Sequence, residues 1–157
     1  MTGRTARVAA TAEPRKGSTN YPEPFRRLFD GRTKRPLGDQ FGLDQFGVNL
    51  TELAPGAMSA LRHWHSHEDE FVYVLEGEVT LVNDDGEERI ATGECVGFKA
   101  GVANAHHLVN RTSAPARYLE IGSRRIEVDH CAYPDDVAVA PDGGGKRRIL
   151  HKDGTPY

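Results

Sequence analysis

At 157 residues and 17.3 kDa, the chain has the length of one domain. A formal net charge of −3 and a pI near 6.2 give no general attraction to nucleic acids or anionic membranes, so we expect neither as a partner. No stretch approaches the roughly 20 apolar residues that span a bilayer, and the start of the chain lacks the apolar run of a secretory signal. We therefore expect a cytoplasmic protein.

The two ends of the chain differ in composition from its middle. Residues 1–20 are polar and basic and are expected to form a flexible arm. Residues 21–130 are expected to form a single β-barrel domain, onto which the aromatic residues Tyr21 and Phe25 anchor an N-terminal packing segment. Residues 131–157 then form a C-terminal extension.

Short strands are expected to dominate the middle of the chain. One helical turn is predicted at 25–29, and the glycine-punctuated segment 38–47 indicates irregular structure or a short strand. From residue 46 onward, alternating or β-branched runs recur, and most end at a turn signal. The expected strands cover residues 48–53, 60–65, 71–75, 79–82, 89–90, 96–98, 106–110 and 117–121. This pattern, without a sustained helical period, indicates an all-β sandwich or barrel with irregular arms.

Five of the seven histidines lie in two clusters, RHWHSHEDE and NAHHLVN. Because successive side chains of a strand point to opposite faces, His63 and His65 share one face and Trp64 lies on the other. Glu70 begins the next expected strand and completes the same face if the two strands pair. Imidazole nitrogens with a carboxylate suit one divalent metal ion, such as zinc, iron, nickel, manganese or copper.

Two segments resemble the signatures of the cupin family. The first, RHWHSHEDEFVYVLEG, matches the spacing of two histidines, a glutamate and a glycine; the corresponding residues, with the upstream glycine, are Gly56, His63, His65, Glu70 and Gly77. The second, GECVGFKAGVANAHHLVN, matches at Gly93, Gly101, His106 and Asn110. Lys99 occupies the usual proline position, and four residues instead of two separate Gly101 from His106, so this loop is longer.

The resemblance, over about residues 46–123, implies a small single-domain bacterial cupin. Such a protein has a jelly-roll-like, double-stranded β-helix barrel with its ligands inside. The metal ligands it implies are His63, His65, Glu70 and His106. The resemblance does not specify a single reaction. We expect an enzyme of dioxygenase, isomerase or lyase type that acts on a small molecule. The alternative is a cupin that binds or senses a small molecule without turnover, and no general base is identified.

Several neighbours of the expected ligands have open roles. His107 should point away from His106, although a slip of one residue in the strand would exchange them. Lys99 is either a contact for an anionic substrate or a solvent-facing lysine. Trp64, with Phe71 and Tyr73, should lie on the face opposite the ligands and pack against the N-terminal arm or a second subunit, which predicts a homodimer. The two cysteines, Cys95 and Cys131, lack metal-site spacing and are expected to be thiols rather than a bridge or zinc ligands.

Overall fold

The computed structural model describes residues 5–141 and 147–157, so residues 1–4 of the predicted arm and 142–146 of the predicted extension lie outside the described residues. The described part contains no α-helix, and none of its helices is long and apolar enough to cross a membrane. Its 3-10 helices are η1 (Ala9–Thr11), η2 (Phe25–Phe29) and η3 (Gly38–Phe41). Its strands are β1 (Arg15–Lys16), β2 (Arg32–Pro36), β3 (Phe46–Leu53), β4 (Trp64–His65), β5 (Glu70–Glu76), β6 (Glu78–Asn83), β7 (Gly86–Ala91), β8 (Cys95–Phe98), β9 (His107–Val109), β10 (Ala116–Ser123), β11 (Cys131–Ala132), β12 (Ala138–Pro141) and β13 (Arg147–Leu150).

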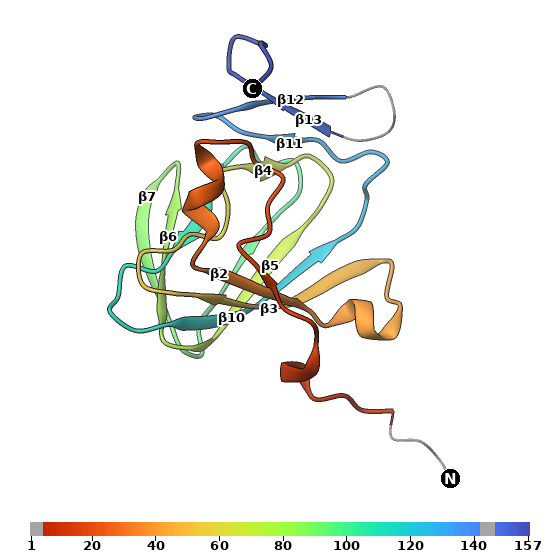
Figure 1. The fold of residues 1–157 in the computed structure, drawn as a ribbon, viewed down its shortest axis with the longest axis vertical. Helices are drawn as coiled ribbons and strands as arrows, with labels where there is room; N and C mark the ends of the chain where they lie inside the picture. Colours follow the sequence, from red (N-terminus) through yellow and green to blue (C-terminus); the bar gives the residue numbers. More distant parts are fainter. Residues whose placement is uncertain (1–4, 142–146) are drawn as a thin grey trace.

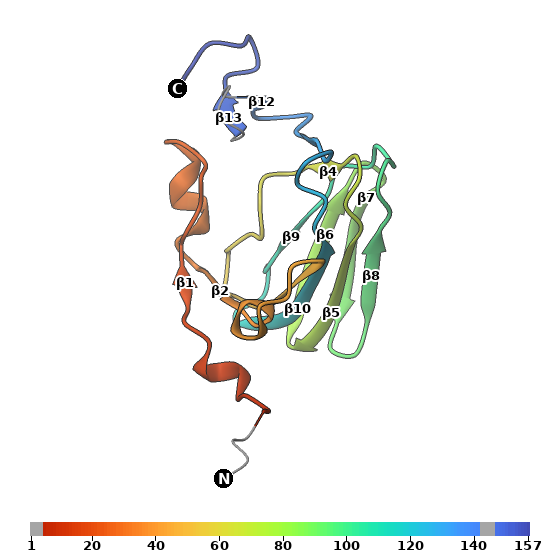
Figure 2. The same ribbon diagram turned by 90° about the vertical axis from the view of Figure 1, so that its right-hand side faces the viewer.

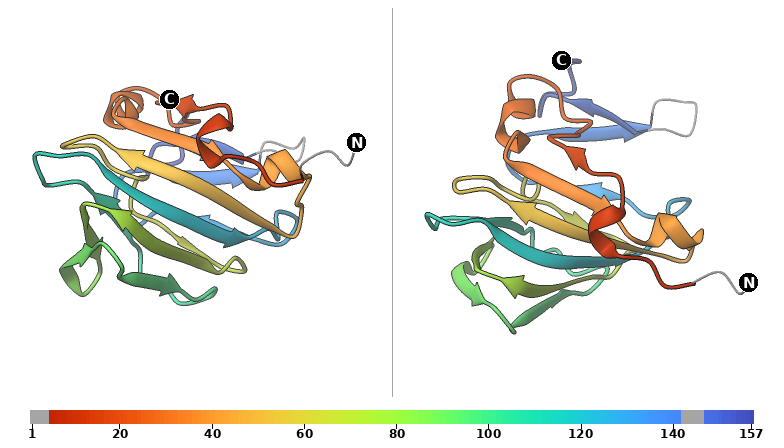
Figure 3. Two further views of the ribbon diagram at one scale, coloured as in Figure 1. Left: turned by 90° about the horizontal axis from the view of Figure 1, so that it is seen from below. Right: turned by 60° about the horizontal axis from the view of Figure 1, so that its bottom comes forward.

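Two main sheets form the body of the protein. The larger has six strands in the order β1-β2-β3-β10-β5-β8, and the smaller has three in the order β7-β6-β9. The strands β2, β3 and β10 run side by side in Figure 3. Strand β4 pairs with β11, and β12 pairs with β13; the latter pair lies at the end of the molecule opposite the N-terminus (Figures 1 and 2).

The core lies between the two main sheets. Residues of the six-stranded sheet, such as Leu53 and Val74, pack in one buried cluster with residues of the three-stranded sheet, such as Val79 and Leu81. In β5 the inward residues are buried and the outward ones exposed, as the period of two along a strand requires. The structure thus confirms the all-β prediction as a two-sheet sandwich. Closure into a double-stranded β-helix barrel stays a prediction.

The expected strands agree with the structure in most places. Those beginning at residues 71, 79 and 96 become β5, β6 and β8, with ends that shift by at most one residue, and the helical turn at 25–29 is η2. In the expected strand 60–65, only Trp64–His65 forms a paired strand. Strand β2 was missed, because its sequence RTKRP is basic and ends in a proline, without the apolar residues that mark a strand.

A second buried cluster joins the two ends of the chain. Tyr21 and Phe29, from the N-terminal segment, pack with Leu61 and Val137, and Phe25 lies against them, as the anchoring prediction requires. The ring of Tyr21 stacks on that of Phe29 with centroids 5.0 Å apart. The terminal segments therefore pack together beside the sandwich.

The hydroxyl groups of Tyr21 and Tyr133 lie 3.0 Å apart in this second cluster. Burial raises the pKa of Tyr21 to about 12, although the hydrogen bond to Tyr133 opposes the shift. The folded protein thus keeps a proton that the unfolded chain loses near pH 10, so this stability is complete below that pH. We expect the free energy of unfolding to fall as pH rises from about 10 to 12, by up to about 3 kcal/mol. Melting temperatures across this range test it: Tyr21→Phe should give a shallower profile, and an unchanged profile would contradict the assignment.

Gly77, between β5 and β6, has a φ of 75°. A Cβ atom there would lie 2.9 Å from the carbonyl oxygen of Pro115 and 3.2 Å from Cα of Ala116. We expect Gly77→Ala to lower the free energy of unfolding in urea by about 2–4 kcal/mol, through both strain and contact. Gly93, with a φ of 88° and nothing within 4 Å of its Cβ position, is the matched control. Its alanine variant should lose only about 1 kcal/mol; equal losses would show that the contacts contribute nothing.

The outer face of β5 carries a row of exposed apolar side chains. Phe71, Tyr73 and Leu75 are each about two-fifths exposed, and no described segment packs over them closely enough to bury them. Phe71 and Tyr73 therefore do not pack against the N-terminal arm in the described part of the chain. The predicted homodimer stays a prediction.

Candidate metal centre

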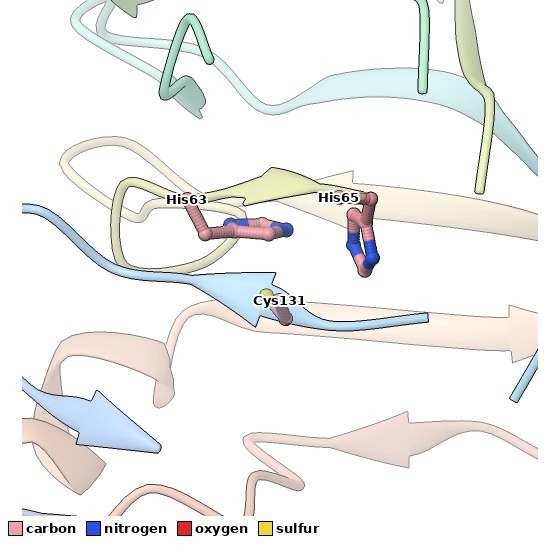
Figure 4. A group of neighbouring side chains, drawn as sticks. All are labelled: His63, His65 and Cys131. Atoms are coloured by element: carbon pink, nitrogen blue, oxygen red, sulfur yellow. The ribbon is translucent and has the colours of Figure 1, made fainter. Parts of the chain in front are cut away.

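His63 and His65 extend from the same side of the chain at β4, as strand alternation predicts. Figure 4 shows both imidazoles projecting from this strand toward β11, where Cys131 is the direct cross-strand partner of His65. The ring centroids of His63 and His65 are 5.1 Å apart. Trp64, between them in sequence, lines a second pocket, on the other side of His65 and Glu70.

The other two expected ligands come from different parts of the sandwich. An antiparallel bridge sets His106 beside His63, with ring centroids 5.5 Å apart. Glu70 begins β5, and its Oε2 lies 3.1 Å from Nε2 of His106 and 3.8 Å from Nε2 of His65. The structure therefore brings all four expected residues together. That they hold a metal is taken up below as a proposal.

Backbone carbonyl groups fix the rings of His63 and His106. Nδ1 of His63 lies 2.7 Å from the carbonyl oxygen of Leu61, and Nδ1 of His106 lies 3.2 Å from that of Asn104. Because a carbonyl oxygen can only accept, each Nδ1 carries a proton and donates it. The Nε2 atoms then face the interior, which is the arrangement typical of metal-binding histidines.

A buried carboxylate fixes the third ring. Nδ1 of His65 lies 2.7 Å from Oδ2 of Asp129, whose side chain has no exposed area. The other oxygen of Asp129 accepts a hydrogen bond from the backbone N–H of His67 at 2.9 Å. Sequence reasoning missed Asp129, since nothing in the pattern distinguishes it from the other acidic residues of the chain.

We expect Asp129→Ala to weaken metal binding by about 10–100-fold, because His65 would lose the acceptor that orients it. Titration of the metal-free protein with zinc or manganese measures the change. Asp129→Asn keeps an acceptor oxygen without the charge, so its metal affinity should lie between those of wild type and Asp129→Ala. A melting curve of each metal-free variant separates this effect from a folding defect, and wild-type affinity in Asp129→Ala would contradict the assignment.

His63 and Glu70 have protonation states that suit metal binding. Burial lowers the pKa of His63 to about 4, against the opposing attraction of Glu70, so the ring is neutral at pH 7. Burial alone would raise the pKa of Glu70, but its contact with His106 and the neighbouring imidazoles lower it to about 2. Neutral imidazole and ionised carboxylate are the forms that coordinate a cation.

The structure separates the positions of the two adjacent histidines, His106 and His107. His107 turns its Nδ1 to the carbonyl oxygen of Ala60 at 3.0 Å, whereas His106 lies beside Glu70. This geometry favours His106 over His107 as the residue that joins His63, His65 and Glu70. Lys99 lines the second pocket with Trp64, and Glu70 and His106 line that pocket as well.

Cys131 is closer to the group than expected. Its Sγ and one ring nitrogen from each of His63 and His65 lie within 4.8 Å of one another, which is compatible with a shared metal ion. The sequence offers no signal for this, because Cys131 lies 66 residues beyond His65 in a segment without a strand pattern. Its position follows from the pairing of β4 with β11.

The four expected ligands line a cavity of about 450 Å³, a size typical of small-molecule sites. Val72 and Leu108 form part of its apolar wall, as their strand parity predicts. On β10, Glu120 reaches the cavity, whereas Tyr118 is buried in the core. Phe98 stacks on the ring of His106 and closes one side.

A two-sheet β fold with an interior group of histidines is characteristic of cupins, and the comparisons agree. Residues 49–122 match the Cupin domain family model. With this match and the relatives described next, the chain belongs to the cupin superfamily.

Two solved structures are similar over most of the chain. A sugar phosphate isomerase from a cupin superfamily, from Silicibacter pomeroyi DSS-3, is 44% identical, covers 94% of this chain and 93% of its own, and superposes with a TM-score of 0.85. A protein from Acidithiobacillus ferrooxidans, proposed to be a sugar phosphate isomerase, is 32% identical with a TM-score of 0.71 and 83% coverage of both chains.

One curated protein is similar over part of the chain. The tetracenomycin polyketide synthase protein TcmJ of Streptomyces glaucescens is 31% identical over 100 residues, which are 60% of this chain. The match spans 65% of TcmJ, so somewhat under two thirds of that protein has a counterpart here.

Proposed function

We propose that this protein is a metal-dependent isomerase that acts on a sugar phosphate. The observation that carries the proposal is the convergence of His63, His65, His106 and Glu70 at one cavity large enough for a small molecule. The similarity to the Silicibacter pomeroyi sugar phosphate isomerase, at 44% identity along nearly the whole chain, supports the reaction class.

The residues present fit one divalent ion. Three imidazoles and a carboxylate suit zinc, iron, nickel or manganese, and fewer than six protein ligands leave room for substrate oxygens. When bound, such an ion polarises a carbonyl or hydroxyl oxygen of the substrate. The backbone and Asp129 contacts to the three Nδ1 atoms hold the rings in place for this role.

Glu120 is the group we assign to proton transfer. Aldose–ketose isomerisation moves a proton between neighbouring carbons and needs a base on the cavity wall. Glu120 lies on β10 opposite Val72, two residues along β5 from Glu70, and it lines the same cavity. Lys34 holds its carboxylate at 2.7 Å, and Nδ2 of Asn49 lies at 3.4 Å, so it is oriented and charge-balanced.

The experiment that tests the proposal begins with the metal content of protein purified without added metal. The protein, loaded in turn with zinc, manganese, nickel and iron, is then incubated with a panel of aldose and ketose phosphates. Interconversion followed by NMR in D₂O, with deuterium entering the carbon next to the carbonyl group, would support the proposal. Absence of turnover with every metal and sugar phosphate would overturn it.

The same preparation tests the other functions open to a cupin. Oxygen uptake by the iron-loaded protein with an aromatic diol would indicate a dioxygenase instead. Tight binding of a sugar phosphate without conversion would indicate a binding or sensing protein.

A further inference from the structure

Strand β2 contributes two cations to the wall of the cavity. Arg32 and Lys34 are two residues apart and therefore point to the same face of the sheet. In the order β2-β3-β10-β5, three strand intervals, or about 14 Å across the sheet, separate β2 from β5, the strand that begins with Glu70. The cavity thus has cations at one side and the histidine group at the other, with space for a small molecule between them.

Arg32 is a buried cation that feels the charge of Glu120 only from beyond ion-pair distance. It is only 6% exposed, lies over the ring of Phe29 at 4.7 Å, and donates to the carbonyl oxygens of Ser18 and Ser59. Among residues 5–141 and 147–157, no carboxylate lies within ion-pair distance of it. Burying a charge whose hydrogen-bond acceptors are all neutral is costly, and an anion bound in the cavity would offset that cost. A guanidinium group also matches the geometry of phosphate oxygens.

The charges on the cavity wall point to the same ligand. Arg32 and Lys34 balance the two carboxylates, Glu70 and Glu120, so the lining is neutral before a metal binds. The proposed divalent ion would leave two uncompensated positive charges. A phosphate monoester, which carries close to two negative charges at neutral pH, restores the balance.

We propose that Arg32 and Lys34 bind the phosphate group of the substrate and so set which end of the sugar faces the histidines. This inference rests on the proposed function for the identity of the rest of the substrate. Lys34 lies between the phosphate and Glu120, and its three N–H donors allow it to contact both. Arg32 also donates a hydrogen bond to the carbonyl oxygen of Ser18, so the same side chain contacts the N-terminal segment and the proposed anion site.

The test is calorimetric titration of the metal-loaded full chain with inorganic phosphate, with glucose 6-phosphate, and with glucose as the uncharged control. We expect Lys34→Gln to weaken binding of both phosphate ligands by about tenfold or more, and Lys34→Arg to bind them nearly as well as wild type. Arg32→Gln should show a larger loss. If Arg32→Gln does not fold, the comparison of Lys34→Gln with Lys34→Arg still shows whether the cations of β2 bind phosphate.

Lys16→Gln is the matched control, because Lys16 is exposed on β1 and does not line the cavity. It should bind phosphate as wild type does. Failure of wild type to bind phosphate, wild-type binding by Lys34→Gln, or a loss confined to Lys16→Gln would each overturn the inference.

The outcomes also separate this inference from the isomerase proposal. Phosphate binding that depends on Lys34, with no sugar phosphate isomerised, would uphold the anion site and reject the isomerase. Isomerisation with the same KM in wild type and Lys34→Gln would uphold the isomerase and reject the anion site.

Discussion

Replacing both His63 and His65 with alanine is expected to abolish metal binding. The two rings lie together at β4 and supply two of the three imidazoles in the proposed centre. The double variant therefore keeps only one imidazole, that of His106, and the carboxylate of Glu70. Since loss of a residue that only orients a ligand weakens binding by about 10–100-fold, loss of two ligands should exceed 100-fold. Metal analysis of the purified variant and zinc titration of the metal-free protein measure the effect.

His67→Ala is the control for this double variant, since His67 lies two residues further along and contacts Ser66 rather than the group. It should keep its metal. Retention of metal by the double variant would contradict the proposed centre. The melting temperature of the double variant shows what the metal does. Loss of metal with little change in melting temperature fits a catalytic or sensing site, whereas a large fall in melting temperature indicates that the metal mainly stabilises the fold.

Glu120→Gln is expected to lower kcat for sugar phosphate isomerisation by about 10²–10⁴-fold, the usual contribution of a positioned acid or base. Glutamine keeps the shape and an acceptor oxygen for Lys34, so binding should change much less than turnover. Steady-state kinetics with the metal-loaded enzyme separates kcat from KM. Metal content measured on the same sample shows that the centre is intact.

Glu52→Gln provides the comparison for this variant, because Glu52 is paired with Arg117 and is exposed to solvent on the sandwich surface. Its kcat should match wild type. Equal activity of Glu120→Gln and wild type would remove Glu120 from the mechanism and leave the base to be found elsewhere on the cavity wall.

The central strands could be predicted because each carries its own local signal. In β5 the alternation of Phe71 and Tyr73 with Val72 and Val74 separates an outer from an inner face, and Gly77 marks the following turn. β2 carries no such signal: its inward side chains are Arg32 and Lys34, which face a polar cavity instead of an apolar core. The rule that strands bury apolar residues fails at a site built to hold charge.

The candidate site divides in the same way. His63 and His65 follow from alternation along one strand, and Glu70 and His106 from motif spacing, so the sequence was sufficient for these four. Asp129 and Cys131 reach the group only through pairing of β4 with β11, a contact between segments more than 60 residues apart. One sequence shows residue types and spacing, but it does not show which distant segments will meet.

The pairing of β4 with β11 also orders events during synthesis of the chain. All strands of the two main sheets, through β10, leave the ribosome before Asp129, Cys131 and Tyr133 are available. The sandwich can therefore form while one wall of the cavity is still missing. All four proposed metal ligands, of which His106 is the last, precede that point, whereas the cavity lining is complete only when residues up to Ile149 have packed in place.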